Sequence, residues 1–499
     1  MSAGDGREGK IRVALSRGQL GGKLAGKSLP RQIITIALWP LLEQVMSFIC
    51  ASISLVLATH MGTDDATTTQ IASGIGVTGY VMWLGFLMQS AVGMGATAIV
   101  SRMTGARRFG EANYVANQAA VLGFLAGILS AFLMYVSADV LVTDILQLSD
   151  YAHEVAMRYM YTGCWVAIFS GIVFAVNAAL RGSGDTKTPF FIMLTVDGLN
   201  IIFSLFLVQV CGLFVEGLAL GMIGGMAAAA LILLAILLRR RQDVCHRIQG
   251  STPEAFESYL ATQESSYVPP LFLCWRSLIP DWRMMWRILC IGIPQAIEVG
   301  GIWLIQIYVL RVISSLGDAA VGAHNIAIRI ESLSFLPGFA IGMAGATLMG
   351  QYLGAGSVRL ALETARRCTT YSVLFMGVMG VFFALFPEFF VGIFTAHSPG
   401  LMAAAVPVVQ IFLLVEPFYA AMLITKMCLR GAGDTRRVMW VSYGGMGLIR
   451  GACLMLWYNL WPETLSLTGI WLLFIADMIV EYLILRHMLY GLKWARRKV

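Results

Sequence analysis

Five of the carboxylates inside long apolar stretches of the sequence are candidates for chemistry. They are Glu43, Asp197, Glu298, Glu416 and Asp477. A charged side chain in an apolar medium is costly unless it is paired or neutralised, so such carboxylates are candidates for functional sites by default. The chemistry that a carboxylate offers there is the reversible binding of a proton or of a cation such as Na+. These five residues are therefore candidates for ion coupling.

Amide side chains and a proline accompany some of these carboxylates. Asn200 follows Asp197 by three residues, so the two share one face of a helix. Asn177 lies in the preceding apolar stretch and is a further polar candidate. Pro40 precedes Glu43, and a proline inside a helix leaves the carbonyl one turn earlier without its donor. Such a carbonyl beside a carboxylate favours the binding of a cation or of water.

The elements that position these residues are predicted to be membrane helices. Hydrophobic residues make up 58% of the 499 residues and charged residues 13%, and the mean hydropathy is +0.76. Soluble domains have roughly 45–50% apolar and roughly 25% charged residues, so lipid must cover much of this surface. This composition excludes a cytosolic enzyme, a nucleic-acid binder and a secreted disulfide scaffold. None of the nine cysteines has a metal-ligand spacing, so neither a metal site nor a cofactor is predicted.

A helix needs about 20 mostly apolar residues to cross a bilayer, and the sequence has twelve such stretches. They cover residues 33–58, 69–100, 114–136, 153–180, 188–210, 216–238, 286–313, 320–350, 368–387, 400–429, 438–458 and 466–489. A membrane β-barrel is rejected, because stretches such as 221–238 do not alternate between polar and apolar residues.

Lysine and arginine gather at alternate connections between these stretches. They occur in the N-terminal arm, in the even-numbered connections and at the C-terminus, whereas the odd-numbered connections carry acidic residues only. Because basic residues stay on the cytoplasmic side, both termini are predicted to lie in the cytoplasm, beneath a plasma (inner) membrane. This bias explains the formal charge of +7 without a nucleic-acid partner.

The two halves of the sequence repeat each other. The motif LRGSGDT at residues 180–186 recurs as LRGAGDT at 429–435, an offset of 249 residues, and Gly105 matches Gly354 at the same offset. Six is an even number of spans, so the halves are parallel repeats, with a substrate site expected between them near mid-membrane. The predicted fold is an all-α integral membrane protein with two six-helix bundles, at 33–238 and 286–490. The remaining segments are a cytoplasmic N-terminal arm (1–32), a cytoplasmic linker with an interfacial helix (239–285) and a basic tail (491–499).

Three segments carry a resemblance to a known family. They are LRGSGDTKTP at 180–189, the run at 322–356 that begins GAHNIAIRIE, and LWPLLEQ at 38–44. All three resemble segments of the multidrug and toxic compound extrusion (MATE) transporters. The resemblance implies two six-helix bundles that form a V, and a cation-coupled antiporter that exports organic cations or amphipathic drugs, driven by inward flow of H+ or Na+. The implied partners are this small-molecule substrate and the lipid bilayer, and the chain is expected to act as a monomer.

The resemblance also implies candidate residues, although the sequence departs from part of the pattern. In the family, an Asn of the fifth span and an Asp of the first contribute to a cation site in the N-terminal half. Asn200 fits the former, but Ser54 and Ser204 stand where the family often has carboxylates. In the C-terminal half, Glu298 and Glu416 match carboxylate positions by helix. The sequence therefore leaves open which half couples and whether the ion is H+ or Na+.

Three further charged residues in the spans are predicted to have structural roles. Arg311 and Arg450 are each expected to offset a buried carboxylate on a neighbouring helix. Glu481 is expected to pair with Arg486, further along the same span.

Two alternative functions remain open at this point. A flippase for lipid-linked oligosaccharides or another polar lipid belongs to the same wider group of transporters. Flippases tend to have extra spans and a basic cleft, whereas the mid-span residues here are mainly acidic, which favours a cationic cargo. An intramembrane enzyme needs a convergent catalytic set, and the six histidines do not cluster, so no enzyme activity is predicted.

Overall fold

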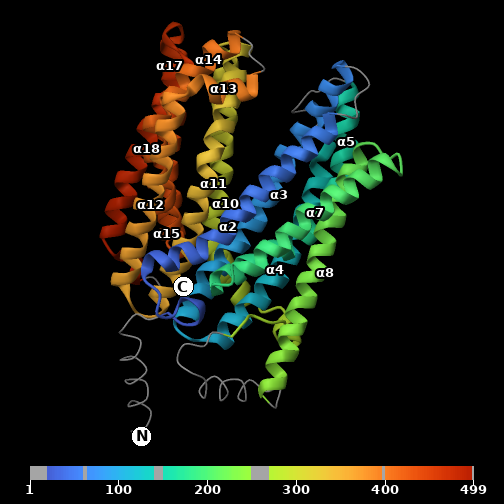
Figure 1. Ribbon diagram of the computed structural model, residues 1–499, viewed down its shortest axis with the longest axis vertical. Coiled ribbons are helices and arrows are strands. Elements are labelled where there is room, and N and C mark those ends of the chain that lie inside the picture. The colour runs from blue at the N-terminus through green and yellow to red at the C-terminus, as the bar shows by residue number, and fades with distance from the viewer. Residues whose placement is uncertain (1–19, 60–64, 140–149, 249–268, 396–398, 497–499) are drawn as a thin grey trace. The chain divides into compact units, whose positions relative to one another are not determined.

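The computed structural model describes residues 20–59, 65–139, 150–248, 269–395 and 399–496 (Figure 1). Over these residues the chain forms helices and no strand, as the sequence predicts. Ten of the described helices are long and apolar enough to cross a bilayer. Large apolar side chains such as Leu231 and Leu304, 67% and 71% exposed, remain uncovered and suit contact with lipid. The chain is a multi-pass membrane protein.

The twelve predicted spans fit the observed series of helices. The first six correspond to α2 (Leu29–Thr59), α3 (Asp65–Gly105), α4 (Phe109–Asp139), the pair α5 (Asp150–Gly163) and α6 (Val166–Ser183), α7 (Lys187–Gln209) and α8 (Val215–Ile248). The last six correspond to α10 (Trp282–Ser314), α11 (Asp318–Gly354), α12 (Val358–Leu385), the pair α14 (Pro399–Gln410) and α15 (Phe412–Gly431), the series α16 (Thr435–Ser442), π-helix η4 (Tyr443–Cys453) and α17 (Leu454–Leu460), and α18 (Leu467–Tyr490). A short helix, α13 (Pro387–Thr395), lies between α12 and α14 in the chain.

The fourth and tenth spans are each broken into two helices. At the first break, the N–H of Ala167 donates to the carbonyl of Cys164 at 3.1 Å, and at the second the N–H of Leu414 donates to the carbonyl of Ile411 at 2.9 Å. Both bonds span three residues, which is the tighter turn of a 3-10 helix. The repeat is therefore visible in helix geometry as well as in sequence.

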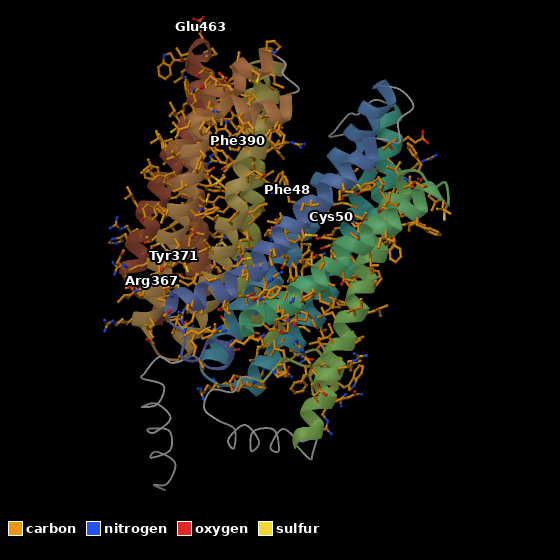
Figure 2. The ribbon with its side chains drawn as sticks, in the orientation of Figure 1. Phe48, Cys50, Arg367, Tyr371, Phe390 and Glu463 are labelled. Carbon is orange, nitrogen blue, oxygen red and sulfur yellow. The ribbon has the colours of Figure 1, made fainter. Side chains whose placement is uncertain are left out.

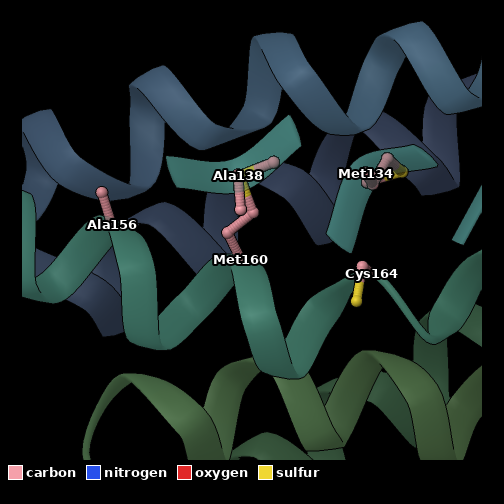
Figure 3. Packing of buried hydrophobic residues seen from close by; sticks show 5 residues of the cluster. All are labelled: Met134, Ala138, Ala156, Met160 and Cys164. Atoms are coloured by element: carbon pink, nitrogen blue, oxygen red, sulfur yellow. The ribbon is translucent and has the colours of Figure 1, made fainter. Parts of the chain in front are cut away.

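Small residues set how closely the helices of the N-terminal half pack. A Cβ atom added to Gly171 of α6 would lie 2.2 Å from the carbonyl oxygen of Gly123 on α4, so only glycine permits this approach. Further along α4, where it meets α5, lies a buried cluster, drawn in Figure 3. It consists of Met134, Ala138, Ala156, Met160 and Cys164. Cys164 thus serves as a small packing residue.

The described chain divides into two compact units. Unit 1 contains Gly26–Leu41 and Ile297–Val499, and unit 2 contains Leu20–Ala25 and Leu42–Ala296. These units are defined by which residues pack together, and their boundaries differ from those of the sequence repeat. The repeat boundaries at 33–238 and 286–490 stay a prediction. Both α2 and α10 are therefore shared between the units.

Each shared helix has an internal proline close to the division, Pro40 in α2 and Pro294 in α10. Within unit 1, the start of α2 is fastened by the hydroxyl of Tyr352, which donates to Gln32 Oε1 at 2.5 Å. Within unit 2, the start of α10 packs against α3 so closely that a Cβ atom on Gly292 would meet backbone.

Three amide side chains of α4 hold the segment that precedes α10. Asn113, Asn117 and Gln118 make six hydrogen bonds of 2.7–3.1 Å to its backbone. The backbone groups belong to Phe272, Cys274, Ser277, Ile279 and Asp281. The described helix of this segment is the short 3-10 helix η3 (Trp275–Leu278), and residues 249–268 of the predicted linker lie outside the described residues. The amides thereby fix the path of the chain between the two halves.

Candidate coupling site

Glu43, in α2, is ion-paired within unit 2. Its Oε1 accepts a hydrogen bond of 2.5 Å from Arg181, in the last turn of α6. The two side chains are 7% and 14% exposed. Because Arg181 belongs to the LRGSGDT motif, this motif supplies the cation that offsets Glu43. A carboxylate whose charge is already offset is a weaker candidate for ion coupling than an unpaired one.

Asp197 and Asn200 share a face of α7, as their spacing predicts. The hydroxyl of Ser47, on α2, donates to Asp197 Oδ2 at 2.9 Å, and the hydroxyl of Ser204 donates to Asn200 Oδ1 at 3.2 Å. Among the described residues no cationic side chain forms an ion pair with Asp197, and the charge that acts on it is that of Glu43. Ser204 thus belongs to this polar cluster, while the side chain of Ser54 lies outside the described part of the chain.

Asn177, in α6, is fully buried, and neither its Nδ2 nor its Oδ1 has a hydrogen-bond partner. Buried polar side chains in proteins are nearly always bonded, so an orphaned amide marks a polar position inside unit 2. The offset of 249 residues takes Asn177 to Lys426, which is charged and paired in unit 1. The two halves therefore differ in charge at the same place in the fold.

Glu298, in α10, forms the counterpart of the Glu43 pair in unit 1. Arg430, which follows Arg181 by the repeat offset, donates to Glu298 Oε1 at 2.7 Å. The hydroxyl of Ser442 also donates to this oxygen, and Lys426 Nζ lies 4.0 Å from it. Glu298 is 1% exposed, and its charge is surrounded by donors.

Two further ion pairs extend this buried network. Lys426 pairs with Glu481, and Arg450 Nη2 lies 2.9 Å from Asp477 Oδ2. The prediction that Arg450 offsets a buried carboxylate is confirmed. The same prediction for Arg311 is wrong, because its side chain is exposed and forms no ion pair with a described residue. The prediction that Glu481 pairs with Arg486 is wrong, because the ammonium of Lys426 on the adjacent helix α15 reaches Glu481 inside the unit, while Arg486 is exposed.

Glu416, in α15, has no such partner. It is completely buried, and no described residue gives either carboxylate oxygen a well-oriented hydrogen bond or an ion pair. The hydroxyl of Ser334, which acts on its charge, donates to the carbonyl of Glu331 at 3.0 Å. The like charge that acts on Glu416 is that of Glu331, on the packed helix α11, and Tyr419 interacts with both carboxylates. Arg450 also acts on Glu331, but its guanidinium is already bound to Asp477. Glu331 and Glu416 therefore interact as like charges, and neither forms an ion pair with a described residue.

The structure separates the predicted site residues into paired and unpaired groups. Glu43, Glu298 and Asp477 have cationic partners, whereas Asp197, Glu416 and the amide Asn177 have none among the described residues. The site residues outside the predicted coupling set are Glu331, Lys426 and Ser442. Lys426 carries the same signal as the carboxylates, a charge inside an apolar stretch, and Glu331 lies in the MATE-like run at 322–356. Among the described residues no three His, Cys, Asp or Glu side chains gather as metal ligands.

Comparisons with known proteins place this arrangement in a family. The family model MatE matches residues 37–206 and 294–452. The chain belongs to the MATE family. This MATE protein is 26% identical over 477 residues to the probable multidrug resistance protein NorM of Thermotoga maritima, a match that covers 94% of each chain. It is 21% identical over 471 residues to the multidrug resistance protein MdtK of Yersinia pseudotuberculosis, covering 94% of this chain and 96% of the relative.

Solved structures share the fold of this MATE protein. A MATE transporter of Vibrio cholerae, VcmN, matches with a TM-score of 0.79 at 15% identity and covers 94% of this chain and 99% of its own. A transporter of the MOP superfamily from Pyrococcus furiosus matches with a TM-score of 0.76 at 16% identity, covering 94% and 97%. The MATE resemblance and the all-α membrane fold are confirmed. The flippase alternative is not favoured.

Proposed function

We propose that this MATE protein is a cation-coupled antiporter that exports organic cations or amphipathic drugs by alternating access. The names of its relatives NorM and MdtK, both multidrug resistance proteins, support this class of substrate. The observation that carries the coupling is the buried carboxylate of Glu416, which has no ion pair and no well-oriented hydrogen bond among the described residues and on which the like charge of Glu331 acts. Two such carboxylates are stabilised when a proton or Na+ binds between them.

Ion binding drives export only if the two states of the transporter bind the ion differently. Glu331 and Glu416 lie on the packed helices α11 and α15, so neutralising them removes a repulsion across one helix contact. An inside-negative membrane potential adds about 2.3 kcal/mol per charge per 100 mV to the inward flow of the ion. Glu298 and Asp477 keep their ion pairs and hold the surrounding helices in place.

Transport by the purified protein in proteoliposomes tests this proposal, with H+ and Na+ gradients imposed separately to identify the ion. Glu416→Gln and Glu331→Gln should abolish gradient-driven efflux of a fluorescent organic cation while leaving its binding measurable, because glutamine fixes the neutral form. Glu463→Gln, at an exposed position labelled in Figure 2, is the matched control. Normal coupled transport by both glutamine variants would overturn the assignment of the coupling site.

Asp197, in unit 2, is a second candidate for coupling, favoured by its single hydroxyl donor Ser47 and its lack of an ion-pair partner among the described residues. Asp197→Asn separates the two candidates. Loss of coupling in Asp197→Asn but not in Glu416→Gln assigns the ion to unit 2.

We also propose that the protein lies in the plasma (inner) membrane with both termini in the cytoplasm, and that it acts as a monomer. The alternation of basic and acidic connections supports the orientation. Cysteine labelling from one side of the membrane tests the orientation.

A further inference from the structure

A polar cavity of about 220 Å³ lies in unit 1, close to the start of α12 and the ends of α15 and α18. Its lining side chains include two arginines, three threonines and two tyrosines, and no carboxylate. The arginines are Arg366 and Arg486, and neither forms an ion pair with a described residue. The next arginine on α12, Arg367, is by contrast paired with Glu363 at 2.7 Å; Figure 2 labels Arg367 at this end of the helix.

The repeat shows what occupies the corresponding place in unit 2. There, Asn117, Ala120 and Val176 line a site that is filled by the chain itself, at Leu271, Phe272 and Leu273. The N–H of Leu273 donates to the carbonyl of Leu237 at 3.4 Å, and Asn117 donates to the carbonyl of Phe272 at 3.1 Å. This segment thus closes the gap between α4, α6 and α8 with apolar side chains and backbone hydrogen bonds.

The chemistry of the site is different in unit 1. The offset of 249 residues takes Asn117, Ala120 and Val176 to Arg366, Thr369 and Thr425, all of which line the cavity. A neutral amide is replaced by a guanidinium, and two apolar side chains are replaced by hydroxyls. Over the described residues the lining comes from α12, α15 and α18, and no described segment fills the cavity as 271–273 does in unit 2. The same position in the fold therefore suits an anion in place of an apolar peptide.

We propose that this cavity binds a phosphoryl group. The planar guanidinium matches the oxygens of a phosphate in geometry and charge, and the hydroxyl of Tyr482, which also lines the cavity, adds a neutral donor. Arg486 is oriented by Tyr490, whose ring centroid lies 5.9 Å from its Cζ. Two unpaired cations repel an organic cation, so the cavity is distinct from the path of a cationic cargo.

Such a phosphoryl group has two sources, the headgroup of an anionic phospholipid and free phosphate. Basic pockets between membrane helices are known to accept anionic headgroups. The melting temperature of the purified protein, titrated with phosphatidylglycerol, phosphatidylcholine or inorganic phosphate, distinguishes the sources, because a ligand that binds the folded state raises it saturably. A rise with phosphatidylglycerol alone assigns a lipid headgroup, and a rise with inorganic phosphate as well shows that the phosphoryl group suffices.

Substitutions of the two arginines test whether the rise in melting temperature arises from binding at this cavity. Arg366→Gln with Arg486→Gln should weaken the apparent affinity by about tenfold or more, the scale of lost charged hydrogen bonds, whereas Arg366→Lys with Arg486→Lys should retain part of it. The matched control is Arg359→Gln with Arg436→Gln, two exposed arginines of the same unit without ion pairs among the described residues, which should bind as the native protein does. The proposal is overturned if neither phosphatidylglycerol nor inorganic phosphate raises the melting temperature saturably. It is also overturned if the control pair of variants loses as much affinity as the cavity pair.

Discussion

Arg430 donates a hydrogen bond of 2.7 Å to Glu298 and thereby ties the last turn of α15 to the middle of α10. Arg181 and Glu43 form the same pair in unit 2 between α6 and α2. Each repeat thus uses the arginine of its RGxGDT motif to neutralise the carboxylate of its first helix. The role that follows for the motif is to hold the first helix of the repeat to the fourth.

Glu298→Gln should destabilise the protein by about 3–5 kcal/mol, because it leaves Arg430 buried without its anion, while Lys426 keeps Glu481. Glu43 is 7% exposed and Glu298 is 1% exposed, so Glu43→Gln, which frees Arg181, should have a smaller effect. Thermal unfolding in detergent compares the two. If Glu298→Gln instead unfolds like the native protein and loses coupled transport, Glu298 is a coupling residue and this structural interpretation is wrong.

Gly171→Ala should destabilise the protein by about 1–3 kcal/mol, because its new methyl group would lie against the carbonyl of Gly123 and force α4 and α6 apart. Gly198→Ala is the control. No atom lies within 4 Å of a Cβ added to Gly198, so alanine should gain up to about 1 kcal/mol of helix propensity there. Equal melting temperatures for the two variants would contradict the close packing described here.

Gln118→Ala should loosen the segment that α4 holds, because it removes three of the six hydrogen bonds to that backbone. The expected result is faster proteolytic cleavage and faster hydrogen exchange between residues 272 and 281. Gln242→Ala, at an exposed position of α8, should leave both rates unchanged. Protection that survives Gln118→Ala would show that packing holds the segment without the amides.

Asp185 should contribute stability that depends on pH. Burial alone would raise its pKa, but the ion pair with Arg240 at 2.7 Å and the hydrogen bonds from Thr188 outweigh burial and lower the pKa below its ordinary value of 3.8. The contribution is therefore present above pH 3.8 and is lost as the pH falls through the lowered value of the folded state. Asp185→Asn should be less stable than the native protein at pH 7, and the two should converge in acid. Asp243→Asn, at an exposed position of α8, should show no such difference at either pH.

Cysteine labelling checks the orientation. In a background without the native cysteines, Glu463→Cys should react with an impermeant maleimide added to intact cells, because Glu463 lies in an acidic, odd-numbered connection. Arg436→Cys, in a basic connection, should react only after the membrane is permeabilised. The reverse pattern would place both termini outside.

The helices and their repeat were predictable because each depends on a local pattern. A span is one continuous apolar stretch, and the second LRG motif repeats the first almost letter for letter. Ion pairing is not local. Glu43 and Arg181 are separated by 138 residues in the sequence. Glu481 pairs with Lys426 on another helix, although Arg486 is much closer in the sequence. Whether Glu416 is paired depends on which helix faces meet, and a single sequence does not contain that information.

The sharing of α2 and α10 between the units bears on whether either half of the chain is complete by itself. The start of α2 completes the unit of Ile297–Val499, and the start of α10 completes that of Leu42–Ala296. A cut between residues 249 and 268 would therefore leave two fragments that each lack a piece of their own unit. The two halves of the chain thus exchange one segment each, and neither half alone contains all of the unit to which most of it belongs.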